Sequence, residues 1–265
     1  MGFTLDGGTL TTMSTRELLI ETISNGIASL RIATDDDPYQ STWFVPALSD
    51  AVETIKTDQS IRCVILEGGR RYFCAGASRA TLMQDDLANP CEYFSQALET
   101  LLSIPVPTIA AMAGHALGGG FATGLWCDVV VLAEESLYGV NFMALGFTPG
   151  MGATTILEEA LGGPLAHELL FTGRLLKGRE IKQSGGGLAH AVVPYEEVRQ
   201  RAIAIASEIA DIPRESLVLL KETLAAKRQA LLEPAVKAEV AMQSQLFSHS
   251  ETRLQIAQRY PAAAN

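Results

Sequence analysis

Two short glycine-containing turns are the places in this sequence where backbone amides could do chemistry. The first is residues 74–78 (CAGAS), soon after an apolar run, and the second is residues 118–120 (GGG), which open a predicted helix. Glycine lets the backbone approach a ligand closely, and the first turn of a helix carries N–H groups without internal acceptors at its positive end. Donors from both turns that converged on one oxygen atom would form an oxyanion hole.

Each turn alone has an ordinary structural interpretation. A GGG run is commonly a tight turn or a close helix contact. The segment GHALGGG has neither the GxGxxG spacing of a dinucleotide site nor the Lys-Ser/Thr of a phosphate-binding loop. Ser78 in the first turn is better suited to fixing the loop than to nucleophilic attack, because no His and Asp partners accompany it.

The apolar periodicity predicts the elements that must position these turns. A hairpin around Asn25-Gly26 (residues 18–32) and strands at 61–66, 107–112 and 128–132 alternate with helices at 44–55, 93–102, from the GGG run to Trp126, and 154–161. A short strand at 188–193 and helices at 198–210, 216–231 and 234–247 follow. Strand–crossover–strand units indicate an α/β layered sheet with a helical C-terminal region.

Composition narrows the class of protein. The 265 residues are 48% hydrophobic and 19% charged, which is typical of a globular chain with a large core. The net charge of −10 argues against a nucleic-acid partner. No segment has the ~18 to 20 apolar residues of a membrane span. The four cysteines form no CxxC pair or metal-ligand pattern, so we expect no metal and a reducing cytoplasm.

Taken together and in order, YFCAGAS, GHALGGGF and YGVNFMALGFTPGMGAT resemble the crotonase (enoyl-CoA hydratase/isomerase) superfamily. The resemblance implies a ββα spiral core at 16–200 after a loose leader at 1–15, and a C-terminal helical region at 201–265 that packs trimers or a dimer of trimers. It implies that the amides of Ala77 and Gly119 hold the thioester oxygen. The substrate would also contact Ala75, Gly76 and Gly118.

The same resemblance disfavours a hydratase. Family hydratases carry one glutamate two residues after GGG and another before the PG turn, and these positions hold Ala122 and Phe142 here. Neither side chain can move a proton. An apolar pocket beside an oxyanion hole suits decarboxylation of an acyl thioester instead, because the hole stabilises the enolate that remains.

The wording NFMALGFTPGMGAT resembles a narrower group, the decarboxylating homologues of polyketide β-branching cassettes. That resemblance implies a 3-methylglutaconyl thioester on an acyl carrier protein as substrate and 3-methylcrotonyl as product. The phosphopantetheine arm belongs to the substrate, so no further cofactor is expected. The group's Lys and His positions fall near Cys91 and Gln243, which leaves the proton donor open.

Several interpretations remain side by side. Gln243 could bind a carboxylate or a water, or be a polar residue at a subunit boundary, and Cys91 could be a weak acid or a packing residue. Tyr93 and a displaced His249 are further donor candidates. Three arginines around the first turn form either a solvated edge or a docking patch for an acidic carrier protein: Arg70, Arg71 and Arg79. The alternatives to decarboxylation are an enoyl or dienoyl isomerase and a degenerate homologue that only binds the carrier.

Overall fold

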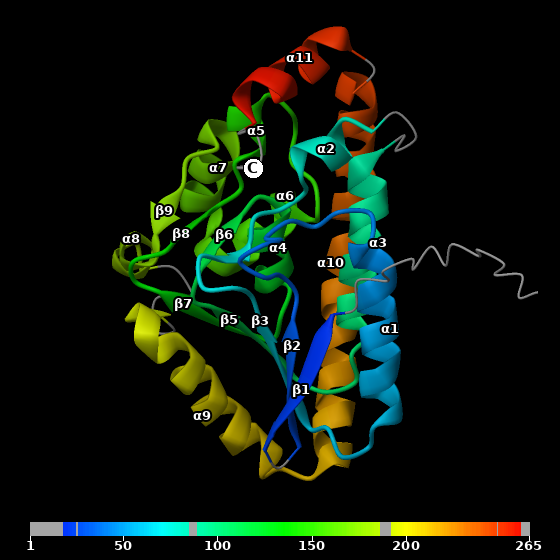
Figure 1. Ribbon diagram of the computed structural model, residues 1–265, viewed down its shortest axis with the longest axis vertical. Coiled ribbons are helices and arrows are strands. Elements are labelled where there is room, and N and C mark those ends of the chain that lie inside the picture. Colours follow the sequence, from blue (N-terminus) through cyan, green and yellow to red (C-terminus); the bar gives the residue numbers. More distant parts are fainter. Residues whose placement is uncertain (1–17, 25, 85–88, 186–191, 248, 261–265) are drawn as a thin grey trace, which may run out of the picture.

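The computed structural model describes residues 18–24, 26–84, 89–185, 192–247 and 249–260. The predicted leader at 1–15 lies outside the described residues, and so does most of the predicted strand at 188–193. The chain folds into two sheets with helices packed around them (Figure 1).

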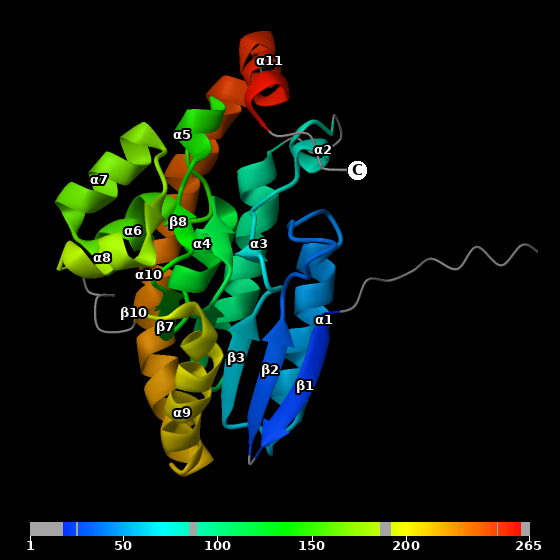
Figure 2. The same cartoon turned by 60° about the vertical axis from the view of Figure 1, so that its left-hand side comes forward.

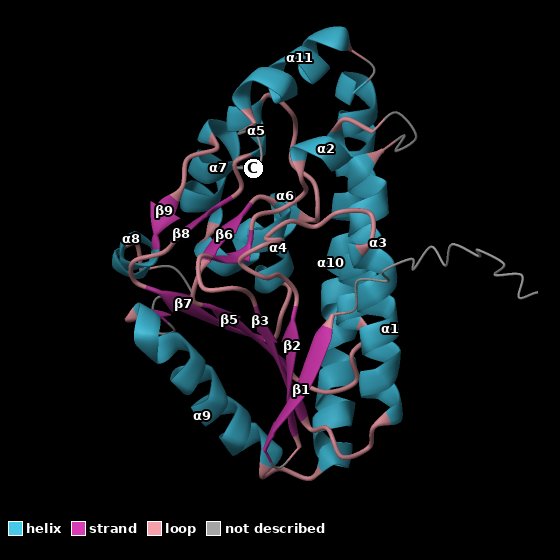
Figure 3. Cartoon of the chain, in the orientation of Figure 1, coloured by secondary structure: helices cyan, strands magenta, loops and turns pink. Residues whose placement is uncertain are grey.

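The larger sheet contains the strands that the apolar periodicity predicted. Its order is β1 (Leu19–Ser24), β2 (Ile27–Arg31), β3 (Cys63–Glu67), β5 (Thr108–Met112), β7 (Val129–Ala133) and β10 (Val192–Val193). The first two strands pair antiparallel through the predicted hairpin, whose Gly26 has φ +83°, and the other pairs are parallel (Figure 3). The predictions for the hairpin and for the parallel α/β arrangement are therefore confirmed.

A second, smaller sheet was not predicted. It consists of β4 (Tyr72–Cys74), β6 (His115–Leu117), β8 (Leu137–Gly139) and β9 (Leu176–Lys177). The segment expected to open a helix at Gly114 instead forms β6, and the helix begins only at Gly119. These strands have two or three residues, which is too short for a period of two to be visible. Because β4 pairs directly with β6, the turns that follow the two strands lie next to each other.

Helices cover both faces of the larger sheet. They are α1 (Phe44–Thr57), α2 (Arg79–Leu82), α3 (Pro90–Leu102), α4 (Gly119–Leu125), α5 (Phe142–Leu145), α6 (Ala153–Leu161), α7 (Gly163–Thr172), α8 (Gly178–Gln183), η2 (Tyr195–Glu197), α9 (Val198–Ala210), α10 (Arg214–Phe247) and α11 (Ser250–Arg259). Alternate residues of β3 face different cores: Cys63 and Ile65 pack with α9, whereas Val64 and Leu66 belong to the core that includes α1 and α3. Figure 2 shows α9 and α1 on opposite sides of the sheet.

Helix α10 corrects the prediction of two separate helices at 216–231 and 234–247. It is one helix of 34 residues with Pro234 inside it. A proline in a helix lacks the N–H for one internal hydrogen bond, which is why the sequence indicated a break. Here Leu232 and Ala235 on either side of the proline are buried, so packing holds the helix together. Across the described ranges, no helix combines the length and the hydropathy needed to cross a membrane.

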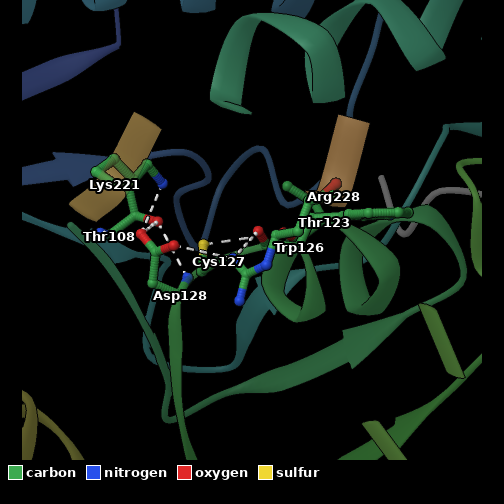
Figure 4. Close-up of polar contacts among 7 residues, drawn as sticks. All are labelled: Thr108, Thr123, Trp126, Cys127, Asp128, Lys221 and Arg228. Atoms are coloured by element: carbon green, nitrogen blue, oxygen red, sulfur yellow. Dashed lines mark hydrogen bonds and ion pairs between the residues drawn. The ribbon is translucent and has the colours of Figure 1, made fainter. Parts of the chain in front are cut away.

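A buried ion cluster fastens α10 to the larger sheet (Figure 4). Asp128, just before β7, accepts hydrogen bonds from Lys221 Nζ at 2.6 Å and Arg228 Nη1 at 3.1 Å. It also accepts from the amide and the hydroxyl of Thr108. Lys221 is 3% exposed, so its charge is balanced inside the protein. The structural role expected for Asp128 is what these contacts describe.

Candidate active site

The two glycine-containing turns are in direct contact. Cys74 of β4 is paired with Ala116 of β6, and each strand leads straight into one of the turns. Gly76 has φ +79°, and a Cβ added to it would lie 3.0 Å from Leu117 O and 3.3 Å from Gly119 N. Only glycine fits this close approach of one backbone to the other. The turns from 36 and 79 residues after Gln40 thus share one wall of a cavity.

The amides of Ala77 and Gly119 are available to a ligand. In the part of the chain that the structure describes, neither N–H is hydrogen-bonded to an acceptor. Gly119 is the first residue of α4, and the first internal bond of that helix runs from Ala122 N to Gly118 O at 3.2 Å. The N–H of Gly119 is therefore one of the unsatisfied donors of a helix start, with the favourable end of its dipole. Both residues line the cavity.

The cavity beside these amides is apolar and uncharged. Its described lining holds no Asp, Glu, Lys, Arg or His. The lining residues are Gln40, Ala75, Gly76, Ala77, Leu82, Pro90, Cys91, Phe94, Gly118, Gly119, Asn141, Phe142, Leu145, Phe147, Gly150, Met151, Gln243 and Tyr260. Phe142 packs edge-on against Phe147, with ring centroids 5.7 Å apart. Ala122 is fully buried within α4 and is not part of the lining.

Cys91 and Gln243, 152 residues apart in the sequence, meet at the cavity wall. Gln243 Oε1 accepts from Cys91 N at 3.2 Å, and its Nε2 donates to Thr148 O at 3.1 Å. The side chain is 3% exposed and ties the start of α3 to the 148–150 turn. A carboxamide has no proton to give at neutral pH. These contacts give Gln243 a positional part in the cavity wall.

The Cys91 thiol faces a buried carboxylate. Its Sγ lies 3.9 Å from both Ser95 Oγ and Glu239 Oε2. Burial, followed by the nearby Glu239 charge, raises the pKa of Cys91 to about 11, so the thiol keeps its proton at neutral pH. Glu239 is fully buried, which raises its pKa, and it accepts from the amides of Gly152 and Thr154 at 2.7 and 2.9 Å. Sequence reasoning missed Glu239. Its only signal is its place four residues before Gln243, on the same helix face.

The other donor candidates lie away from the cavity. Tyr93 donates its hydroxyl to Thr42 O at 2.5 Å, and His249 is an exposed residue before α11. Ser78 caps α2 by accepting from Thr81 N at 3.0 Å, the loop-fixing role predicted for it. His, Cys, Asp and Glu side chains of the described ranges form no cluster of three or more suited to a metal ion.

The arginines around the first turn stand beside acidic residues. Arg70 and Arg71 are exposed, and Arg79 is half-buried at the start of α2. Asp35 Oδ1 accepts from Arg71 N at 2.9 Å, and Asp36 next to it is exposed. The positive charge at this edge is therefore partly offset by neighbouring carboxylates.

Comparison with known proteins agrees with this geometry. The family model described as enoyl-CoA hydratase/isomerase matches residues 40–261. The bacillaene synthase decarboxylase PksI of Bacillus subtilis is 37% identical over 209 residues, which cover 79% of this chain and 83% of PksI.

Two solved structures share the fold over nearly their whole length. One is the ECH2 decarboxylase domain of CurF from Lyngbya majuscula, with TM-score 0.80 and 32% identity, covering 91% of this chain and 98% of that domain. The other, from work on a dehydratase/decarboxylase enzyme couple involved in polyketide β-branching, has TM-score 0.83 and 33% identity, covering 94% of this chain and 98% of that one. With its two turns, its paired sheets and these matches, the chain belongs to the enoyl-CoA hydratase/isomerase family and has the crotonase fold.

Proposed function

We propose that this protein decarboxylates a 3-methylglutaconyl-type thioester, carried on the phosphopantetheine arm of an acyl carrier protein, to the 3-methylcrotonyl thioester in polyketide β-branching. The observation that carries the proposal is the pair of free amides, Ala77 and Gly119, opening on a cavity with no ionised side chain in its described lining. The likeness to decarboxylases named for polyketide pathways supports the same reaction.

The geometry suits charge that moves from a carboxylate to a thioester oxygen. When the C–C bond to the carboxylate breaks, its electron pair forms a dienolate, and carbon dioxide leaves. The amides of Ala77 and Gly119 would stabilise the negative charge that develops on the thioester oxygen. No cation of the described lining would hold the substrate carboxylate in its ground state. Binding would therefore favour the transition state, in which the charge is spread towards the amides.

The dienolate must then take up one proton. Cys91 is the cavity residue whose thiol retains a proton at neutral pH, and we propose it as the local donor. Transfer would form a C–H bond at the dienolate and leave a thiolate, which water reprotonates. The Glu239 carboxylate disfavours that thiolate, so its lifetime would be short. Net consumption is one proton for each carbon dioxide released.

Addition of water is disfavoured by the same cavity. The two positions that carry glutamates in hydratases are the fully buried Ala122 and the aromatic Phe142. Neither can activate water or deliver a proton. Isomerisation by a proton relay through Cys91 is the second candidate, because that thiol lies on the cavity wall.

The partners are proposed from surface features. Leu219, Leu220 and Leu224 on α10 are 66%, 58% and 40% exposed, an apolar stretch that supports a trimer or a dimer of trimers. The arginines at 70, 71 and 79 could meet an acidic carrier protein, although Asp35 and Asp36 weaken that edge. All four cysteines are free thiols, and we keep a reducing cytoplasm as the proposed compartment.

Release of labelled carbon dioxide tests the reaction. The substrate is a 3-methylglutaconyl carrier protein with a ¹³C label in its free carboxylate, and gas is followed by membrane-inlet mass spectrometry. We expect labelled carbon dioxide at one equivalent per substrate. A crotonyl carrier protein serves as the hydration control, and no water should be added to it. Conversion without labelled gas would move the assignment to isomerisation.

A further inference from the structure

A buried glutamine from outside both turns contacts each of them. Gln40 lies in the segment between β2 and α1, lines the cavity and is 1% exposed. This segment runs beside the first turn: Ala75 N donates to Pro38 O at 2.7 Å, and Gln40 N donates to Gly76 O at 2.8 Å. Gln40 and Ala77 also form an isolated parallel bridge. The backbone of Gln40 thus fixes the first turn.

The bond to Gly76 O aims the first oxyanion donor. The carbonyl of Gly76 and the N–H of Ala77 belong to one planar peptide, in which they point in opposite directions. Holding the carbonyl on Gln40 therefore directs the Ala77 N–H away from Gln40, on the side left free for a ligand. A hydrogen bond to the carbonyl also polarises the N–H of the same peptide and makes it a stronger donor.

The side chain of Gln40 reaches the second turn. Its Nε2 donates to Thr123 Oγ1 at 3.1 Å, and Thr123 Oγ1 donates to Gly119 O at 2.8 Å. The hydroxyl has a single hydrogen, which it gives to Gly119 O, so it can only accept from Gln40. A Cβ added to Gly119 would lie 3.3 Å from Gln40 Oε1, which shows that the amide packs against this turn.

We propose that Gln40 is a positioning residue that sets the distance and direction between the two oxyanion amides, through its own N–H on the first turn and through Thr123 on the second. The inference rests on the proposed function only in assuming that both amides bind the thioester oxygen. The brace is buried, since Thr123 is also 1% exposed, and a polar group without water is held strongly in its pairings. Displacing a donor by a fraction of an ångström lowers the rate of the chemical step.

Two side-chain variants remove the link while keeping its shape. Gln40→Met and Thr123→Val each delete the hydrogen bond between the residues, and Thr123→Ser keeps the hydroxyl. The matched control is Thr108→Val, because Thr108 is a second threonine with 1% exposure whose hydroxyl serves Asp128 rather than either turn (Figure 4). It measures what loss of a buried threonine hydroxyl does to stability alone.

The first readout is independent of the reaction catalysed. The probe is 3-methylcrotonyl phosphopantetheine with a ¹³C-labelled thioester carbonyl, and its stretching frequency is recorded by infrared difference spectroscopy at saturation. Wild type and Thr108→Val should shift the band to lower frequency, because both amides polarise the carbonyl. Gln40→Met and Thr123→Val should lose most of that shift, and Thr123→Ser should recover it.

The second readout is turnover of the carrier-protein substrate. We expect kcat to fall about tenfold in Gln40→Met and in Thr123→Val with KM nearly constant. The double variant should be no slower than either single variant, because both act through one contact.

Three results would overturn the brace: a wild-type band shift in Gln40→Met and Thr123→Val, an equal loss of shift in Thr108→Val, or no shift in wild type. A normal pattern of shifts without release of carbon dioxide would reject the decarboxylase and leave the brace standing. If Gln40→Met does not fold, the isosteric Thr123→Val decides the question.

Discussion

Replacing Ala77 by proline would delete one oxyanion donor with little other change. The Ala77 N–H is bonded to no acceptor among the described residues, so the substitution removes no internal hydrogen bond there. Gly76 precedes it at φ +79°, and glycine tolerates the restriction that proline places on its neighbour. Loss of one such donor costs about 2.7 to 4 kcal/mol of transition-state stabilisation, which is a fall in kcat of about 10²- to 10³-fold.

The assay is single-turnover decarboxylation of the acyl carrier protein substrate, with binding measured separately. Carrier affinity should change little, because the donor acts mainly on the developing charge. Ala77→Gly keeps the N–H and should lose less than about tenfold. Gly119→Pro removes the other donor at the first position of a helix, where proline is tolerated, and should match Ala77→Pro. A folded Ala77→Pro protein with kcat within about tenfold of wild type would refute the oxyanion role.

Three other predictions concern stability and packing. Asp128→Ala leaves Lys221 buried without its partner and should lower the free energy of unfolding by about 3 to 5 kcal/mol in urea titration, whereas an unchanged midpoint would show that the cluster contributes nothing. Gly120→Ala places a Cβ 2.3 Å from Cys74 O, so we expect a large fall in Tm, and a normal Tm would contradict the packing of the two turns. Burial raises the pKa of the thiols from 9.0 to about 11 in Cys91 and about 12 in the other three, so above pH 9 the unfolded chain binds fewer protons than the folded one. Stability should therefore be fully retained below pH 9 and fall by about 1.4 kcal/mol per thiol per pH unit above it, and a flat profile between pH 8 and 10 would be inconsistent with buried thiols.

The apolar periodicity predicted the elements that are long enough to repeat it. The strands β3, β5 and β7 and the helices α1 and α9 appear within a few residues of their predicted ranges. The strands β4, β6 and β8 have three residues each and carry no periodic signal, although they are what brings the two turns together. Pro234 signalled a helix end, but burial of the residues around it outweighs one missing hydrogen bond.

The candidate site was predictable only as far as it is local in sequence. The two turns and their family positions indicated Ala77 and Gly119, and the lining of the cavity includes both together with Cys91 and Gln243. Gln40 and Glu239 were missed because their contacts span 83 and up to 148 residues. An isolated Gln or Glu in a sequence looks like any surface residue, and only the fold shows that these two are buried.

Intact-mass analysis of a 3-methylglutaconyl carrier protein incubated with this protein tests the central claim most directly. We predict that the carrier loses a mass equal to carbon dioxide with wild type, and that it loses far less in the same time with Ala77→Pro. A carrier whose mass stays constant in the presence of folded wild-type protein would contradict the proposed decarboxylation and favour isomerisation, which leaves the mass unchanged, or binding alone.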